Sequence, residues 1–380
     1  MSDEYKHTDF YKNGPYKSLD DFIEDDMGNK IPYLKKDLKF FYRKITLLYG
    51  ETESGKSTII QEIMYLMKDR IPNVIIFAPT NDSNGLYTGK VRGPAIFRKL
   101  TIDILAEINE RQKKAMKIYS IANDMETMRS IFVRFADDRM KAIVNTVNKE
   151  IERHLQIAAT QYSDPGLRHA EEKKVRDMQS QALRSAYKYV IANNKKTLMH
   201  DPSLSDTQKI AVQFHDLNPD LMLIFDDCAS FFKEHQKEPL IMDMFYQGRH
   251  DGLTSVFSFQ GDKDIPPNLR RAAHTAIFTT STCAMAHFGT TSNGYDKQTK
   301  KRADLAIARI FKQDGDMPTY RKLAYLRNEA EKIQCILADS YGDFKMGGLW
   351  VRKYLETIEP KSLSSGYDKA LIKEILSMSK

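Results

Sequence analysis

Cysteine, long apolar runs and a strong charge of one sign are all scarce in this 380-residue sequence. The three cysteines, Cys228, Cys283 and Cys335, are widely spaced and lack paired His or Cys neighbours, so neither a disulfide framework nor a zinc site is expected. The apolar runs have the length of strands and the first residues lack the apolar stretch of a signal peptide, which predicts a soluble intracellular protein with no membrane segment. A net charge of +7 permits a polyanionic partner without requiring one.

The pattern along the chain divides it into four parts. Residues 1–40 mix acidic and aromatic side chains and predict either an arm that docks on another surface or a disordered segment. Residues 41–100 and 216–295 alternate strand-length apolar runs with helical stretches, which predicts one α/β domain. Residues 101–215 have apolar side chains at helical spacing and predict a long helical insertion into that domain. Residues 296–380 are predicted to form a basic extension that packs on the α/β core.

Five apolar runs predict the strands of a mostly parallel sheet flanked by helices. They begin at Ile45, Asn73, Leu221, Leu253 and His274. A helix is expected over 56–70, because Pro72 stops it. After residue 296 the chain predicts a helix over 297–311, short strands near 320–325 and 333–337, and a terminal helix over 368–379.

A glycine-bracketed loop follows the first predicted strand and precedes the first predicted helix. Its sequence, "GETESGKST", fits the phosphate-binding pattern G-x-x-x-x-G-K-[ST]. Backbone N–H groups of such a loop turn inward on phosphate oxygens, the lysine adds a point charge for the β- and γ-phosphates, and the serine offers an oxygen to Mg²⁺. The predicted ATP-binding residues are therefore Gly50, Glu51, Thr52, Glu53, Ser54, Gly55, Lys56, Ser57 and Thr58.

Two adjacent acids, Asp226 and Asp227, end the buried run "LMLIFDDC". The first carboxylate at such a strand end is suited to hold Mg²⁺ together with Ser57, and the second to orient or deprotonate the attacking water. Two acids together favour hydrolysis over transfer of phosphate to a substrate. Gln260 ends the run "LTSVFSFQ" and is the candidate contact to the γ-phosphate, as in P-loop ATPases that carry an extra strand between the loop strand and the acidic strand.

Three stretches together resemble a known family. They are "GETESGKST", "LMLIFDDC" and "FYQGRHDGLTSVFSFQGDKDIPPNLRRAA". They are similar to the genome-packaging ATPases of poxviruses and other large nucleocytoplasmic DNA viruses, which belong to the FtsK–HerA superfamily of DNA-pumping motors. The run Gly248–His250, the strand ending in Gln260 and the run Ile265–Arg270 are the most specific part. The resemblance covers residues 40–100 and 218–282, and it implies a P-loop NTPase fold of the RecA-like, ASCE class.

The resemblance also implies a function and partners. A homo-oligomeric ring of about five or six subunits would hydrolyse ATP with Mg²⁺ and move double-stranded DNA into a preformed capsid, with a capsid or portal protein as partner. The expected location is the interior of the host cell, in a cytoplasmic virus factory or the nucleus, with association with the virion left open. Two features depart from the family: the insertion 101–215 is long, and Asp227 stands where many members have Glu.

Ring ATPases insert an arginine into a neighbouring subunit's site to stabilise charge on the transferring phosphoryl group. Arg249 and Arg270 are the candidates, with Arg271 behind them, and neither spacing nor composition decides among them. Contacts to DNA phosphates are expected from basic residues after position 296, unless these side chains only form a solvated face. They are Lys297, Lys300, Lys301, Arg302, Arg309, Arg321, Lys322 and Arg327.

Two other functions stay open at this point. A terminase-like enzyme or a helicase would also use the ATP site, but the roughly 100 residues after Thr280 are short for a nuclease domain. A nucleotide kinase or a non-motor ATP switch is the third alternative, and the inserted helices could supply its lid. The double acid and Gln260 argue against this third alternative.

Overall fold

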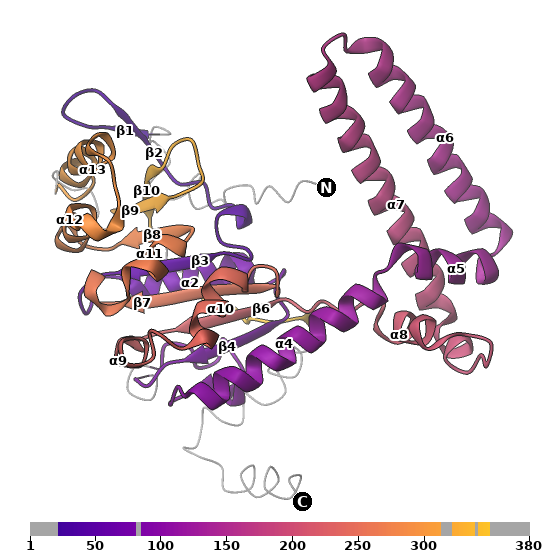
Figure 1. Cartoon of the computed structure of the whole chain (residues 1–380), viewed down its shortest axis with the longest axis horizontal. Coiled ribbons are helices and arrows are strands. Elements are labelled where there is room, and N and C mark those ends of the chain that lie inside the picture. The colour runs from indigo at the N-terminus through magenta and orange to yellow at the C-terminus, as the bar shows by residue number, and fades with distance from the viewer. Residues whose placement is uncertain (1–21, 81–84, 313–320, 339–340, 350–380) are drawn as a thin grey trace, which may run out of the picture. The chain divides into compact units, whose positions relative to one another are not determined.

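The computed structural model describes residues 22–80, 85–312, 321–338 and 341–349 (Figure 1). The chain forms two compact units, with unit 2 comprising Arg111–Pro219 and unit 1 the residues before and after it. Helix α4 (Ile102–Ala122) begins in unit 1 and ends in unit 2. Among the described residues, no helix is both long enough and apolar enough to span a bilayer.

An eight-stranded sheet forms the centre of unit 1, with the order β10-β9-β8-β3-β7-β6-β4-β5. The strands are β3 (Ile45–Tyr49), β4 (Asn73–Phe77), β5 (Ile96–Phe97), β6 (Leu221–Phe225), β7 (Leu253–Phe259), β8 (Thr275–Phe278), β9 (Arg321–Leu326) and β10 (Ile333–Leu337). The strands from β8 to β5 are parallel, whereas β9 and β10 extend the sheet antiparallel. The predicted mostly parallel α/β sheet is confirmed, and the two late strands belong to it.

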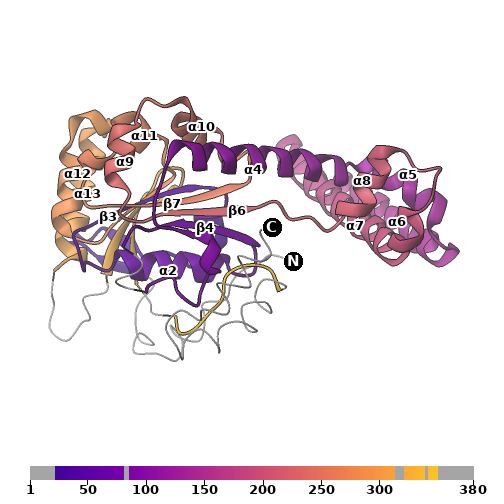
Figure 2. The same cartoon turned by 90° about the horizontal axis from the view of Figure 1, so that it is seen from below.

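Both faces of the sheet are covered, because the strands are apolar on both sides. Successive residues of β3 illustrate this: Leu47 belongs to the core of one face and Leu48 to the core of the other. Figure 2 shows α2 on one side of the sheet and α10 and α11 on the other. The helices are α2 (Lys56–Met67), α9 (Ala229–Glu234), α10 (Pro239–Gln247), α11 (Pro267–Ala272), α12 (Ser281–Gly289) and α13 (Lys297–Ile310), with short 3₁₀ turns η1 (Leu38–Phe40), η2 (Gly93–Ala95), η3 (Asp262–Asp264) and η4 (Thr291–Asn293).

A hairpin of β1 (Phe22–Glu24) and β2 (Lys30–Pro32) is the first described part of unit 1. Its residues Ile23 and Ile31 join the same core as Ile333 and Cys335 of β10, and the backbone N–H of Leu34 donates to the carbonyl of Cys335 at 2.8 Å. The described part of the predicted N-terminal arm is therefore ordered against the sheet. Residues 1–21 and the predicted terminal helix over 368–379 lie outside the described residues.

Unit 2 consists of helices, as the spacing of its apolar residues predicts. Besides the end of α4 it contains α5 (Met125–Phe135), α6 (Asp138–Gln161), α7 (Pro165–Met199) and α8 (Asp206–Phe214). Pro165 occupies the first turn of α7, where its missing N–H costs nothing, and Asp164 caps that helix by accepting from the N–H of Leu167 at 2.8 Å. A small core that includes Phe132, Tyr187 and Ile191 holds the helices together.

Candidate nucleotide-binding site

The predicted site residues follow strands that end at the same edge of the sheet. In the register Tyr49 of β3 is opposite Phe259 of β7, so the loop and Gln260 begin side by side. Strand β7 also pairs with β6, which carries the acids at its end. Adjacent strands are about 4.8 Å apart, and the carboxyl ends of parallel strands are the usual place for ligands in such sheets. We call this edge the nucleotide edge.

The loop between β3 and α2 is tightly folded. Gly55 has φ 94° at the start of α2, a conformation that favours glycine, and Glu53 has φ 61°. At Gly50 a Cβ atom would lie only 1.7 Å from Oγ1 of Thr279, so only glycine fits there. The Ser54 hydroxyl lies 2.5 Å from the same Thr279 oxygen, which fixes the loop against the end of β8.

Lys56 is buried inside this loop. Its Nζ donates to the carbonyls of Gly50 at 2.6 Å and Glu51 at 2.7 Å. Burial lowers the pKa of Lys56, while the charges of Asp227 and Asp226 act in the opposite direction. The amine and the positive end of the α2 dipole therefore meet at one point, which is the arrangement that binds a phosphate group. Ser57, in the first turn of α2, is half-buried beside it.

Asp226 is buried and held by a tyrosine that the sequence analysis missed. The hydroxyl of Tyr87, which lies between β4 and β5, donates to Oδ2 of Asp226 at 2.8 Å, and the backbone N–H of Asp226 donates to Phe77 at 2.9 Å. Burial raises the pKa of Asp226, and the hydrogen bond from Tyr87 partly opposes that shift. Tyr87 is one of 19 tyrosines and stands in no motif, so nothing in the sequence singles it out.

Asp227 differs from its neighbour because it is exposed. Its φ of 55° turns the backbone at the end of β6, a conformation that aspartate tolerates better than most residues. Oδ2 of Asp227 accepts from the hydroxyl of Thr80 at 3.2 Å. The adjacent Cys228 is buried and donates to the Phe77 carbonyl, and burial raises its pKa to about 12, so it is a packed thiol.

Gln260 is exposed at the nucleotide edge immediately after β7. The backbone N–H groups of Gln260 and Gly261 donate to Oδ2 of Asp264 at 3.1 and 3.0 Å, which holds the turn that carries the amide. The sheet thus gathers Lys56, Asp226, Asp227 and Gln260 from distant parts of the chain.

Arg249 lies at the other end of the strands. It precedes β7, is exposed, and its Nε donates to Nε2 of His250 at 3.2 Å. Together with Lys44 and His274 it lines a cavity of about 140 Å³ at the amino ends of β3 and β8. Arg249 therefore does not belong to the nucleotide edge of its own chain.

Arg270 is buried, which does not suit the predicted role of reaching a neighbouring subunit. Its guanidinium pairs with Asp262, and the same carboxylate lies 2.5 Å from Nδ1 of His287 and accepts from Asn293 at 3.0 Å. Removing the arginine from this cluster would take its guanidinium partner from the buried carboxylate of Asp262. The ion pair with Asp262 holds the Arg270 side chain in the interior of its own subunit.

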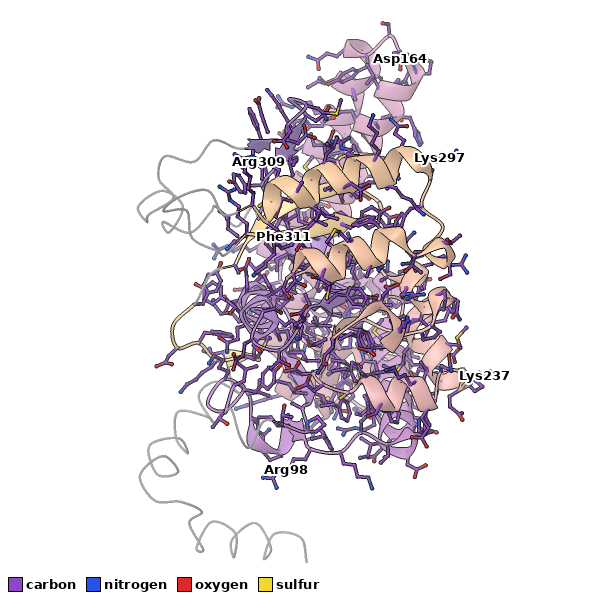
Figure 3. The ribbon with its side chains drawn as sticks, turned by 90° about the vertical axis from the view of Figure 1, so that its left-hand side faces the viewer. Arg98, Asp164, Lys237, Lys297, Arg309 and Phe311 are labelled. Carbon is purple, nitrogen blue, oxygen red and sulfur yellow. The ribbon has the colours of Figure 1, made fainter. Side chains whose placement is uncertain are left out.

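The basic residues after position 296 are not one continuous face. Figure 3 labels Lys297 and Arg309 at opposite ends of α13. Arg302 pairs with Glu331 at 2.5 Å, and Nε of Arg309 donates to the carbonyl of Glu24 at 2.8 Å. Arg321 and Lys322 are buried in β9, which does not suit the expected contact with DNA.

The strand order and the loop define the class of protein: a P-loop NTPase in which an additional strand, β7, separates the loop strand from the strand that carries the acids. No family model matches the chain. The chain is 29% identical over 315 residues to B354L, an uncharacterised protein of African swine fever virus, and the match covers 80% of this chain and 83% of B354L.

Solved structures similar to this chain include two nucleotide complexes. The genome packaging NTPase B204 from Sulfolobus turreted icosahedral virus 2, with ATP-gammaS, has a TM-score of 0.34 and 16% identity over 80% of this chain and 97% of B204. The plasmid coupling protein TrwB, with a non-hydrolysable GTP analogue, has a TM-score of 0.35 and 12% identity over 86% of this chain and 91% of TrwB. The relative in African swine fever virus agrees with the resemblance to proteins of large DNA viruses that the motifs indicate.

Proposed function

We propose that the protein is an ATP-driven motor that moves double-stranded DNA and packages a viral genome into a capsid inside the infected cell. The observation that carries the proposal is the position of β7 between β3 and β6, because it sets Gln260 between the phosphate loop and the acid pair. The relative in African swine fever virus supports a viral role. The packaging-ATPase motifs Gly248–His250 and Ile265–Arg270 support DNA as the substrate that is moved.

Each residue of the nucleotide edge has a distinct role in this proposal. Lys56 neutralises phosphate charge, and Ser57 and Asp226 hold Mg²⁺. Bound ATP with Mg²⁺ supplies the phosphoanhydride bond that water cleaves. The exposed Asp227 orients the attacking water or accepts its proton, and Gln260 contacts the γ-phosphate. The buried and exposed environments of the two acids fit this division, since a metal ligand benefits from a fixed position and a base needs access to water.

A ring of subunits would place Arg249 of one copy in the nucleotide site of the next. Its exposure and its distance from the nucleotide edge of its own chain favour this role over one in cis. In mixtures with wild-type subunits, Arg249→Ala should lower ATP hydrolysis below the wild-type fraction, whereas Arg153→Ala, at an exposed arginine of unit 2, should not. Hydrolysis strictly proportional to the wild-type fraction in both mixtures would remove Arg249 as the candidate.

The test of the motor is ATP hydrolysis by the assembled full chain with and without duplex DNA. Wild-type protein should be stimulated by DNA, and Asp226→Ala should show no hydrolysis in either condition. Asp216→Ala, at an exposed acid in unit 2, is the matched control and should behave as wild type. Absence of stimulation in an assembled ring counts against the motor. Phosphate transfer to a nucleoside or its monophosphate would favour a kinase, and Mn²⁺-dependent DNA cleavage a terminase-like enzyme.

A further inference from the structure

Lys322 reaches the nucleotide edge from the late, antiparallel part of the sheet. Strand β9 runs opposite to β8, so it starts at the edge where β8 ends, and Leu323 pairs with Phe278. Lys322 is therefore level with Thr279, the residue that packs against the loop, and its Nζ donates to the Thr279 carbonyl at 3.3 Å. The sequence analysis placed this lysine among residues facing DNA.

The amine of Lys322 lies directly beside the phosphate loop. A Cβ atom at Gly55 would be 3.4 Å from Cε and 3.7 Å from Nζ of Lys322. Gly55 immediately precedes Lys56, so two lysine side chains approach the same turn, one from helix α2 and one from strand β9. In the sheet order the acids of β6 lie on one side of β3 and Lys322 of β9 lies on the other.

Lys322 has no acid to balance its charge within the part of the chain that the structure describes. Its side chain is 9% exposed, burial lowers its pKa, and no carboxylate opposes that shift. Lys36, a lysine buried to a similar degree, pairs instead with Glu62 at 3.1 Å. A buried ammonium group is costly unless it is paired, so an unpaired one at the rim of a phosphate loop indicates an anionic ligand.

We propose that Lys322 is a second phosphate-binding lysine of the nucleotide site, supplied in cis by β9 and contacting the polyphosphate from the side of β3 opposite to Asp226. The inference rests on the proposal that the loop binds ATP. It adds a residue outside the motif and makes the antiparallel extension of the sheet part of the site. Lys56 binds from inside the loop and Lys322 from its outer rim.

The experiment measures binding of ATP and of inorganic triphosphate to the full chain by calorimetry. Lys322→Met removes the charge but keeps the length of the side chain, and the dissociation constants of both ligands should rise roughly 10- to 100-fold, the value of a charged hydrogen bond. Lys322→Arg should recover most of the affinity. Lys332→Met, at an exposed lysine between β9 and β10, is the matched control and should bind as wild type.

Thermal unfolding without ligand separates a binding role from a structural one. Lys322→Met should melt at the wild-type temperature or above it, because a buried charge is replaced by an apolar chain. A lower melting temperature together with unrescued binding in Lys322→Arg would overturn the inference, as would unchanged ATP affinity in Lys322→Met. If wild-type protein binds ATP and Lys56→Ala does not, either of these two outcomes rejects only the phosphate-binding role of Lys322 and leaves the ATP site standing. If wild-type protein does not bind ATP, the proposed function fails as well.

Discussion

Units 1 and 2 differ in the kind of polar side chain that they bury. In the described part of unit 2 the buried polar side chains are Gln112, Asn123 and His215. Each of them is within hydrogen-bond distance of a backbone carbonyl. In unit 1 ionisable groups are buried at the nucleotide edge, where Lys56, Asp226 and Lys322 all have pKa values shifted by burial. Buried charge also occurs elsewhere in unit 1, in the ion pairs of Arg270 with Asp262 and of Lys36 with Glu62. Desolvated charge costs stability, so the groups at the nucleotide edge whose pKa values are shifted by burial indicate where ligands and chemistry are expected.

The comparison teaches that the two units can be disabled separately. In the proposed function unit 1 carries the chemistry, whereas unit 2 is a group of helices around a small core. Changes at the nucleotide edge should stop hydrolysis without loosening unit 2. Changes in the core of unit 2 should loosen it without stopping basal hydrolysis.

The largest effect is expected from Lys56→Ala. ATP hydrolysis should fall on the order of 10²–10³-fold or more, because the charge that balances the phosphates is lost. Lys188→Ala, at a half-buried lysine of unit 2 whose pKa is also lowered by burial, should leave the rate within about twofold. Steady-state hydrolysis measures both, and an equal loss in the two variants would break the distinction between the units.

Ile191→Ala should give the next largest effect, in unit 2. Ile191 is 0% exposed in the core of that unit, and its truncation should cost about 2–5 kcal/mol of unfolding free energy there. Hydrogen exchange should show loss of protection in α5, α7 and α8, while basal ATP hydrolysis stays near wild type. Ile63→Ala, equally buried against the sheet, is the control that should lower hydrolysis as unit 1 unfolds.

Tyr87→Phe should produce a smaller, pH-dependent effect. In the proposed function the ionised form of Asp226 holds the metal ion, so activity should be lost as pH falls through the pKa of that group. Removing the Tyr87 hydroxyl removes a hydrogen bond that lowers this pKa, so the acid limb of the rate profile should move to higher pH. A roughly three- to tenfold lower rate is expected on the acid side. If the acid limb of the rate profile does not move, a group other than Asp226 determines its position.

Leu167→Asp should have the smallest effect. Leu167 is 61% exposed in the first turn of α7, where an acid is favourable to the helix dipole. The unfolding free energy of the isolated subunit should change by no more than about 0.5 kcal/mol. A loss above that in denaturant titration would show that this side chain is buried by contacts within the chain.

Local patterns predicted the elements that carry the proposed site. The loop Gly50–Thr58 lies between a strand and a helix, and the acids and Gln260 each follow an all-buried strand, as the motif and the apolar runs indicate. The residues that were missed depend on sheet order rather than on local sequence. Tyr87 and Lys322 reach the site only because distant segments end at the same edge.

The arginines show a different limit of sequence analysis. Arg249 and Arg270 look alike in the sequence, because both stand near turns in basic surroundings. Their environments differ because Asp262 and His287 close over one of them and not the other. Burial of a charged residue is decided by tertiary packing, which spacing does not encode.

The order of the strands also has a consequence for synthesis of the chain. Strand β3 is apolar and wholly buried in the finished sheet, but its partners β7 and β8 are translated much later. At a synthesis rate of about 5–20 residues per second, this gap of about 200 residues lasts roughly 10–40 s. During that time the helices of unit 2 can fold through their local contacts. The β3 segment has no strand partner until β7 and β8 are made, so its apolar side chains are exposed to chaperones.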